Sequence, residues 1–176
     1  MAETKEQKNY KISLVGSPNV GKTSISLMQA QKAFPPKHQP TLGTNFVVWD
    51  TKVDSVDIKL IIADTGSQER FEPVLPKYFQ GSLAFAFIFD LTNKSTFVKL
   101  DYWMELVEKA VKGAPRVLVG NKVDLKDKRV ISEEEAKEYA KEKGIKYFEV
   151  SAKENINLDE VFKCLVSYAY ERDKSN

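Results

Sequence analysis

Apolar and polar positions along this chain follow two different rhythms. Segments in which apolar residues recur at every second position, or without interruption, predict β-strands. They are Tyr10–Val15, Thr44–Val53, Val56–Ala63, Leu83–Phe89, Arg116–Gly120 and Lys146–Val150. The tight polar turn Asp54-Ser55 joins the second of these segments to the third and predicts a hairpin. Leu83–Phe89 is apolar throughout, which is typical of a central strand covered on both faces.

Between the strands, apolar residues recur at the spacing of a helix. A first helix is predicted from Ser24 to Ala33. Ser132 with Glu135 makes a capping box for another helix that Gly144 ends, and Asn157 opens the last helix. The apolar faces of two helices are Phe97, Leu100, Met104, Val107 and Val111, with Trp103 beside them, and Leu158, Val161, Phe162, Leu165 and Val166. We interpret these stripes as protein core rather than as cofactor-binding surfaces.

Strands that alternate with helices predict an α/β fold, with a mostly parallel, twisted sheet and helices on both faces. A length of 176 residues suits one domain. We place this domain at residues 9–171, between a polar N-terminal extension at 1–8 and a C-terminal tail at 172–176 that lacks cysteines for lipidation. Ligands of such sheets bind outside the carboxyl ends of the strands. Polar motifs at strand ends are therefore the candidates for function.

Composition narrows the class of protein. Hydrophobic residues make up 42% of the chain and charged residues 30%, as in a soluble globular protein. A net charge of +2 without a dense basic block argues against nucleic acid as a partner, and no segment is apolar for the 18 residues that a membrane span needs. A single cysteine, Cys164, excludes an intrachain disulfide and points to a reducing compartment. We expect a cytoplasmic monomer.

Residues 16–23, Gly-Ser-Pro-Asn-Val-Gly-Lys-Thr, match the phosphate-binding pattern G-x-x-x-x-G-K-[ST]. The pattern lies between a predicted strand and a predicted helix, so the unpaired N–H groups of the helix start would face the loop. Gly16 and Gly21 allow a tight turn and a close approach to phosphate oxygens. Lys22 adds a positive charge, and Thr23 offers a hydroxyl to Mg²⁺. A chance match arises in about one chain in a hundred, and the strand–loop–helix context makes it rarer.

Further polar motifs follow other predicted strands. Asp64 ends an apolar strand, where its carboxylate suits the outer shell of Mg²⁺ or, alternatively, caps the strand. Residues 121–124 read Asn-Lys-Val-Asp. Asp124 can accept two hydrogen bonds from guanine that adenine cannot donate, although such a tetrapeptide can also be an ordinary turn. Asn121 can tie loops together, the Lys122 stem can lie over the base, and residues 151–153 (Ser-Ala-Lys) would direct a backbone N–H at the guanine oxygen.

Together these segments resemble the five motifs of Ras-like small GTPases, in order and in spacing, over about residues 9–170. The matching segments are Gly16–Thr23, Thr41, Asp64–Gln68, Asn121–Asp124 and Ser151–Lys153. The runs Pro40–Phe46, Gln68–Phe71 and Phe89–Phe97 are most similar to the Rab branch. The resemblance implies a small G domain of the P-loop NTPase class. Such a domain has a six-stranded, mostly parallel sheet with one antiparallel edge strand and helices on both faces.

The resemblance also implies a role for each matching residue. GTP or GDP would be the ligand, held by Gly16, Ser17, Asn19, Val20, Gly21, Lys22, Thr23, Ser24, Thr41, Ser67, Asn121, Lys122, Asp124, Ser151, Ala152 and Lys153. Thr23 and Thr41 would bind Mg²⁺ directly, and Asp64 would bind it through water. Gln68 would orient the water that attacks the γ-phosphate. Phe46 and Tyr78 would belong to the surface that binds effector proteins.

These roles imply a switch that binds GTP and GDP, hydrolyses GTP slowly and regulates vesicle traffic. Since no arginine finger is evident in the chain, an activating protein would supply one, and an exchange factor and effectors are the other expected partners. Action on the cytosolic face of endomembranes would need a lipidated tail that this sequence does not carry. The alternative is an interaction module that binds guanine nucleotide with little or no hydrolysis.

Three departures from the family pattern are expected to matter. Pro18, which has no N–H, stands where many relatives have glycine or serine, close to the γ-phosphate. Gly66 and Ser67 stand where the family has alanine and glycine; Ser67 would resist a backbone flip that needs positive φ, and Gly66 would take over as the hinge. Ala63 replaces the tryptophan of an effector-facing aromatic triad. Trp49, on the preceding strand, is expected to replace that tryptophan in part.

Overall fold

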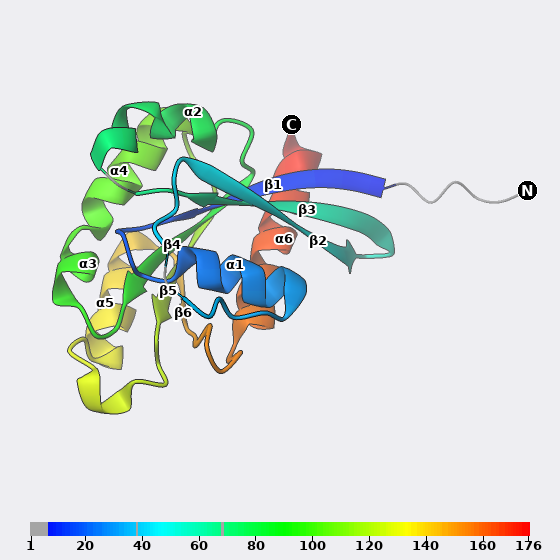
Figure 1. Ribbon diagram of the computed structural model, residues 1–176. Coiled ribbons are helices and arrows are strands. Elements are labelled where there is room, and N and C mark those ends of the chain that lie inside the picture. Colours follow the sequence, from blue (N-terminus) through cyan, green and yellow to red (C-terminus); the bar gives the residue numbers. More distant parts are fainter. Residues whose placement is uncertain (1–6, 38, 68) are drawn as a thin grey trace, which may run out of the picture.

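A computed structural model of the chain, which describes residues 7–37, 39–67 and 69–176, contains a six-stranded sheet (Figure 1). In spatial order its strands are β2 (Thr44–Val53), β3 (Val56–Thr65), β1 (Gln7–Val15), β4 (Ala84–Asp90), β5 (Arg116–Asn121) and β6 (Lys146–Glu149). β2 pairs antiparallel with β3, and the other neighbouring strands are parallel. The predicted sheet, with its antiparallel edge strand, is confirmed.

Helices cover both faces of the sheet, as predicted. They are α1 (Lys22–Gln31), the 3₁₀-helix η1 (Glu69–Val74), α2 (Leu75–Phe79), α3 (Lys94–Val98), α4 (Leu100–Ala110), the 3₁₀-helix η2 (Lys126–Lys128), α5 (Glu133–Lys143) and α6 (Leu158–Ser175). α1 and α6 pack on one face, around buried residues that include Leu60 and Phe162. Figure 1 shows α2, α3, α4 and α5 gathered on the other side, where Phe87 and Trp103 are buried.

β4 illustrates how the strand pattern sets these two layers. Every residue of β4 is buried, as its uninterrupted apolar run predicts. Successive side chains point to opposite faces, so Ala84, Ala86 and Ile88 join the core under α1 and α6. Phe85, Phe87 and Phe89 join the core under α2 to α5. The larger aromatic side chains thus fill the side of the sheet that carries more helices.

The segment between β4 and β5 forms two helices where the sequence predicts one. The apolar face of Phe97–Val111 predicts a single helix, but α3 and α4 are separated at Lys99, where φ is −77° and ψ is −2°. Val111 lies just beyond the end of α4. In α3, the ring of Phe97 packs edge-on against Phe89 of β4, with 5.0 Å between the centroids. This packing depends on the position of β4, which helical spacing does not encode.

The predicted N-cap residues of α5 and α6 are confirmed as Ser132 and Asn157, but only Ser132 caps its helix through its side chain, and the Glu135 carboxylate pairs with Lys94. The Ser132 hydroxyl accepts the N–H of Glu135 at 3.1 Å, and Gly144, with φ at +67°, ends α5. Asn157 precedes α6 as predicted, but its side chain makes no cap. Its Nδ2 instead donates to the carbonyl of Glu149 at 2.9 Å and closes the preceding loop onto β6. A local cap motif was thus overridden by a longer-range contact.

The two ends of the described chain are tied together. The Lys8 ammonium and the Tyr10 hydroxyl both donate to the Asp173 carboxylate, at 2.8 Å and 3.0 Å. These bonds fasten the start of β1 to the last turns of α6, which continues to Ser175. Within the described residues, no helix combines the length and the apolar character needed to cross a bilayer.

Candidate functional site

The loop after β1 is held so tightly that two of its positions require glycine. A side chain on Gly16 would place its Cβ 2.2 Å from the carbonyl oxygen of Ile88, and one on Gly21 would lie 2.2 Å from Nδ2 of Asn121. Gly21 also has a φ of +100°, in the left-handed region. α1 begins directly after Gly21 without a side-chain cap. The N–H groups of its first turn therefore remain for a ligand in the loop, which suits an anion.

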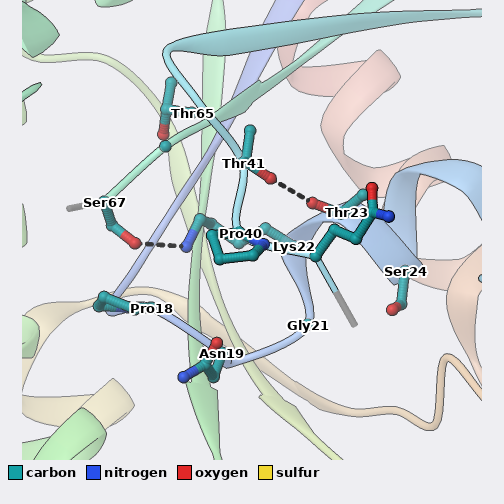
Figure 2. Close-up of a pocket in the computed structure, with 12 residues that line it drawn as sticks. Pro18, Asn19, Gly21, Lys22, Thr23, Ser24, Pro40, Thr41, Thr65 and Ser67 are labelled. Atoms are coloured by element: carbon teal, nitrogen blue, oxygen red, sulfur yellow. Dashed lines mark hydrogen bonds between the residues drawn. The ribbon is translucent and has the colours of Figure 1, made fainter. Parts of the chain in front are cut away.

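Lys22 lies at the centre of this loop and is buried (6% exposed). Its ammonium donates to the carbonyl oxygens of Gly16 and Ser17, both at 2.9 Å, and to the hydroxyl of Ser67 at 3.0 Å (Figure 2). Burial lowers the pKa of Lys22 to about 8, against the opposing attraction of the Asp64 carboxylate. The loop thus places a positive charge in a largely buried site, where electrostatic interactions are stronger than in bulk water.

Thr23, Thr41 and Asp64 converge beside Lys22, although they come from three separate segments. The hydroxyls of Thr23 and Thr41 lie 2.7 Å apart (Figure 2), and both donate hydrogen bonds to Oδ2 of Asp64. β3 continues to Thr65, so Asp64 lies within the strand, one residue before its end. Burial raises the pKa of the fully buried Asp64, opposed by Thr23, Lys22 and Thr41.

This cluster has the chemistry of a divalent-cation site. Among the described residues, no hydrogen-bond donor reaches Oδ1 of Asp64, although that oxygen is buried. A buried carboxylate oxygen without a partner is costly. Hydroxyl and carboxylate oxygens are the ligands that Mg²⁺ prefers. Thr23, Thr41 and Asp64 therefore fit Mg²⁺ in the outer or inner coordination shell.

Gly66 joins the segment after β3 to the segment before β2. Its N–H donates to the carbonyl of Gly43 at 2.5 Å, and a Cβ on Gly66 would lie 2.6 Å from the carbonyl oxygens of both Gly43 and Thr41. Its φ lies outside the left-handed region. Glycine is therefore needed at position 66 for close approach of two backbones, a reason that differs from the positive φ expected of a hinge.

On the other side of the loop, side chains from β5 and the segment after β6 form a hydrogen-bonded frame. Nδ2 of Asn121 donates to the carbonyl of Val20 at 2.9 Å, and its Oδ1 accepts the N–H of Ala152 at 3.2 Å. Asn121 thus ties these loops together, as its position suggests. The Ser151 hydroxyl donates to Oδ1 of Asp124 at 2.7 Å, which fixes the orientation of that carboxylate.

Lys122 is held to both sides of this frame. Its ammonium donates to Oδ2 of Asp90 at 2.6 Å and to the carbonyl of Asn19 at 3.0 Å. Its φ of 72° and that of Asn19, 67°, are left-handed. Lys153, the last residue of the predicted set, is exposed, and it lines neither of the cavities described below. The structure thus gathers the residues from both predicted halves of the site at one edge of the sheet.

Two adjoining cavities run along this edge. The inner chamber, of about 60 Å³, is lined by Pro18, Asn19 and residues 21–24, 39–41 and 65–67 (Figure 2). The outer pocket, of about 500 Å³, is lined by Asn19, Gly21, Thr23, Ser24, Leu27, residues 34–37, Gln39 and Lys122. They share Asn19, Gly21, Thr23, Ser24 and Gln39. A ligand with a phosphate end and a planar end could therefore span both.

Two aromatic residues belong to this site that the sequence motifs do not reveal. Phe34 is 45% exposed and lines the outer pocket together with Lys122. Trp103 of α4 is buried, and its indole N–H donates to the Ser17 hydroxyl at 3.2 Å. The sequence signal for Trp103 is the indole N–H on a helix face predicted to be buried, because a buried tryptophan N–H needs an acceptor. The sequence signal for Phe34 is a large apolar residue within a proline-rich loop.

The predicted aromatic surface is partly corrected. Phe46 is 54% exposed and lies opposite Ala63 in the β2–β3 pairing. Trp49 cannot stand in for the missing tryptophan, because strand alternation turns it to the other face, where it packs edge-on against Phe162 with 6.0 Å between the centroids. The Lys11 ammonium occupies this region instead, where it donates to the carbonyl of Tyr78 at 2.6 Å and lies 5.9 Å from the centre of the Phe46 ring. Gln68, the predicted catalytic residue, lies outside the described residues.

Comparison with known proteins agrees with this geometry. The model of the Ras family matches residues 11–171. Ras-related protein Rab-13 of Canis lupus familiaris is 36% identical over 157 residues, which cover 89% of this chain and 77% of that protein. Ras-related protein Rab-3D of Homo sapiens is 36% identical over 164 residues, which cover 93% of this chain and 75% of that protein. The matched residues include both cavities.

Proposed function

This chain belongs to the Ras family and is similar to its Rab members, and from that premise we propose that it is a guanine-nucleotide switch. It binds GTP or GDP together with Mg²⁺, hydrolyses GTP slowly and takes part in membrane traffic. The observation that carries the proposal is the continuity of the two cavities, from Lys22 and Ser67 at one end to Lys122 at the other. The phosphates would occupy the inner chamber and the base the outer pocket.

The residues of the inner chamber would handle the phosphates. Lys22 and the N–H groups at the start of α1 would hold the β- and γ-phosphates, and Thr23, Thr41 and Asp64 would hold Mg²⁺. The bound ion would neutralise charge on the phosphate oxygens. Catalysis in this class rests on positioning and charge stabilisation, and Gln68 is the proposed residue that orients the attacking water.

The residues beside the outer pocket would select guanine. Asp124, oriented by Ser151, would accept the two hydrogen bonds that guanine offers and adenine lacks. Asp124 is two positions from Lys122 and is not itself among the residues that line the pocket. The Lys122 stem and the Phe34 ring, which do line it, would contact the base and sugar. An exchange factor, an activating protein and effectors are the proposed partners, with action on the cytosolic face of endomembranes.

A second candidate is a module that holds guanine nucleotide with little hydrolysis. The observation in its favour is that Pro18 and Ser67 both line the inner chamber, beside the place proposed for the γ-phosphate. Pro18 narrows the approach of an arginine from an activating protein. Ser67 already bonds to Lys22.

One experiment separates the candidates. The purified protein is denatured, the nucleotide it releases is identified by chromatography, and hydrolysis of GTP loaded onto fresh protein is followed in a single turnover. The switch predicts released GDP or GTP and slow formation of GDP. Bound guanine nucleotide without product over hours would favour the module, and adenine nucleotide would contradict both.

A further inference from the structure

The Lys22 ammonium carries three N–H donors, and the structure provides an acceptor for each. Two acceptors are the carbonyls of Gly16 and Ser17, which belong to the loop that leads directly into the lysine. The third is the hydroxyl of Ser67, which comes from the segment after β3. Figure 2 shows the Ser67 hydroxyl pointing at the Lys22 ammonium. A phosphate oxygen can therefore bind this ammonium only in exchange for one of these three acceptors.

We propose that Ser67 is a specificity-determining residue whose hydroxyl competes with the terminal phosphate of a nucleoside triphosphate for Lys22. The inference rests on the proposed function and deepens it. The two loop carbonyls belong to the segment that would cradle the β-phosphate, which is common to both nucleotides, so that phosphate would exchange with one of them. Ser67 belongs to a different segment and lines the chamber beside Pro18 and Thr41, so its hydroxyl is the acceptor that a γ-phosphate displaces. A diphosphate, which lacks the γ-phosphate, leaves the Ser67 contact in place.

Displacement of Ser67 also reaches the segment before β2. Gly66, the neighbouring residue, is bonded to the carbonyl of Gly43 and packs against that of Thr41 too closely to admit a Cβ. A shift of Ser67 away from Lys22 therefore acts on the backbone that positions the Thr41 hydroxyl beside Thr23. Binding of the γ-phosphate thus replaces the hydrogen bond between Ser67 and Lys22 by one between the phosphate and Lys22. This exchange acts on the segment after β3 and on the segment before β2.

The consequence is a nucleotide preference shifted toward the diphosphate. Loss of one hydrogen bond to a charged group changes an affinity by about tenfold. Removal of the Ser67 hydroxyl should strengthen triphosphate binding by about that factor and leave diphosphate binding within about twofold.

The test measures the dissociation constants of GDP and of a non-hydrolysable β,γ-imido GTP analogue, with Mg²⁺, on the nucleotide-stripped chain. Ser67→Ala removes the hydroxyl but keeps a Cβ, whereas Ser67→Gly also frees the backbone. Ser167→Ala, on the exposed face of α6, is the matched control. We expect both Ser67 variants to raise the affinity ratio of triphosphate to diphosphate by about tenfold, and the control to leave it unchanged.

The outcomes distinguish this inference from the function on which it rests. Normal guanine-nucleotide binding with an unchanged ratio in Ser67→Ala would overturn the competition. Weaker triphosphate binding in Ser67→Ala would overturn it too, since the hydroxyl would then assist the γ-phosphate. A rise in Ser67→Gly alone would assign the effect to backbone freedom and contradict the role of the hydroxyl. Failure of the wild type to bind either guanine nucleotide would overturn the proposed function itself.

Discussion

The outer pocket and the inner chamber differ in what holds their side chains. Around the outer pocket, the amide of Asn121 and the ammonium of Lys122 each bond to two other segments, and Ser151 orients Asp124. These bonds join the loop after β1 to the ends of β4 and β5 and to the segment that follows β6. The inner chamber is closed by residues 39–41 and 65–67, which flank the edge pair β2 and β3.

The two regions also differ in how closely they follow the family pattern. The residues of the outer frame match it, whereas Pro18, Gly66 and Ser67 depart from it and all line the inner chamber. If the frame recognises one base, as proposed, it gains from rigidity, because preorganised groups lose little freedom on binding. A chamber with the proposed response to one phosphate group would depend on contacts that can be exchanged. The comparison predicts that changes in the frame affect which nucleotide binds, and changes in the chamber affect how its phosphate number is sensed.

The largest expected effect is in the frame. Asp124→Asn replaces a carboxylate acceptor by an amide that still accepts from Ser151 but offers N–H groups to the donors of guanine. We expect GDP affinity to fall by a factor on the order of 10³ or more, and affinity for xanthosine diphosphate to rise. Asp127→Asn, on exposed η2, is the control. Equal GDP affinity in the two variants, measured by displacement of a fluorescent analogue, would show that Asp124 does not read the base.

The next effect is in the chamber and depends on the number of phosphates. Gly66→Ala forces a Cβ against the carbonyls of Gly43 and Thr41, so the segment that carries Thr41 must move away from Thr23. We expect affinity for the GTP analogue with Mg²⁺ to fall about tenfold more than affinity for GDP, because one hydroxyl of the proposed Mg²⁺ site is displaced. Gly113→Ala, which introduces a side chain at positive φ but meets no atom within 4 Å, controls for stability alone. Parallel losses for both nucleotides would place Gly66 outside phosphate sensing.

A smaller effect is expected where the core supports the loop. Trp103→Phe keeps the aromatic packing but removes the N–H that the Ser17 hydroxyl accepts. One neutral hydrogen bond contributes about 1 kcal/mol, so we expect about fivefold faster release of both nucleotides. Trp49→Phe, the same change at a tryptophan that packs on Phe162 across the sheet, should leave the release rate unchanged. Identical rates in the two variants would remove Trp103 from the site.

The smallest effect on nucleotide binding is expected at Glu149 of β6. Its carboxylate accepts hydrogen bonds from Arg129 and Tyr147. Burial works to raise the pKa of Glu149, but these hydrogen bonds outweigh it and hold that pKa below its usual value. A depressed folded-state pKa gives stability that is present at neutral pH and is lost as pH falls through that pKa.

Glu149→Gln should therefore lower the free energy of unfolding by about 1–2 kcal/mol at pH 7 and by less at pH 3. Nucleotide affinity should stay within about twofold. Urea unfolding at the two pH values measures the difference, and Glu108→Gln, at the more exposed Arg116 pair, should show a smaller loss at pH 7. A loss for Glu149→Gln that does not change with pH would contradict the charge-based account.

Much of this site could be anticipated from short-range patterns. Glycine spacing and the flanking strand and helix predicted the loop around Lys22, since each requirement is local. Asp64, Thr41 and Asp124 followed from strand ends and from the resemblance. The bond from Ser67 to Lys22 joins residues 45 positions apart, and that from Trp103 to Ser17 joins residues 86 apart. The periodicity of apolar residues along the chain does not predict contacts between residues that are so far apart in sequence.

The sequence by itself determined the alternation of strands and helices, the burial of β4 on both faces and the loop that cradles Lys22, because these depend on local spacing and backbone freedom. The tertiary structure decided what the departures mean. It turned Trp49 away from Phe46, required glycine at position 66 for close approach rather than for positive φ, and placed the Ser67 hydroxyl on the lysine ammonium. The physical reason is that these outcomes depend on which face of the sheet a side chain occupies and on where two distant loops meet.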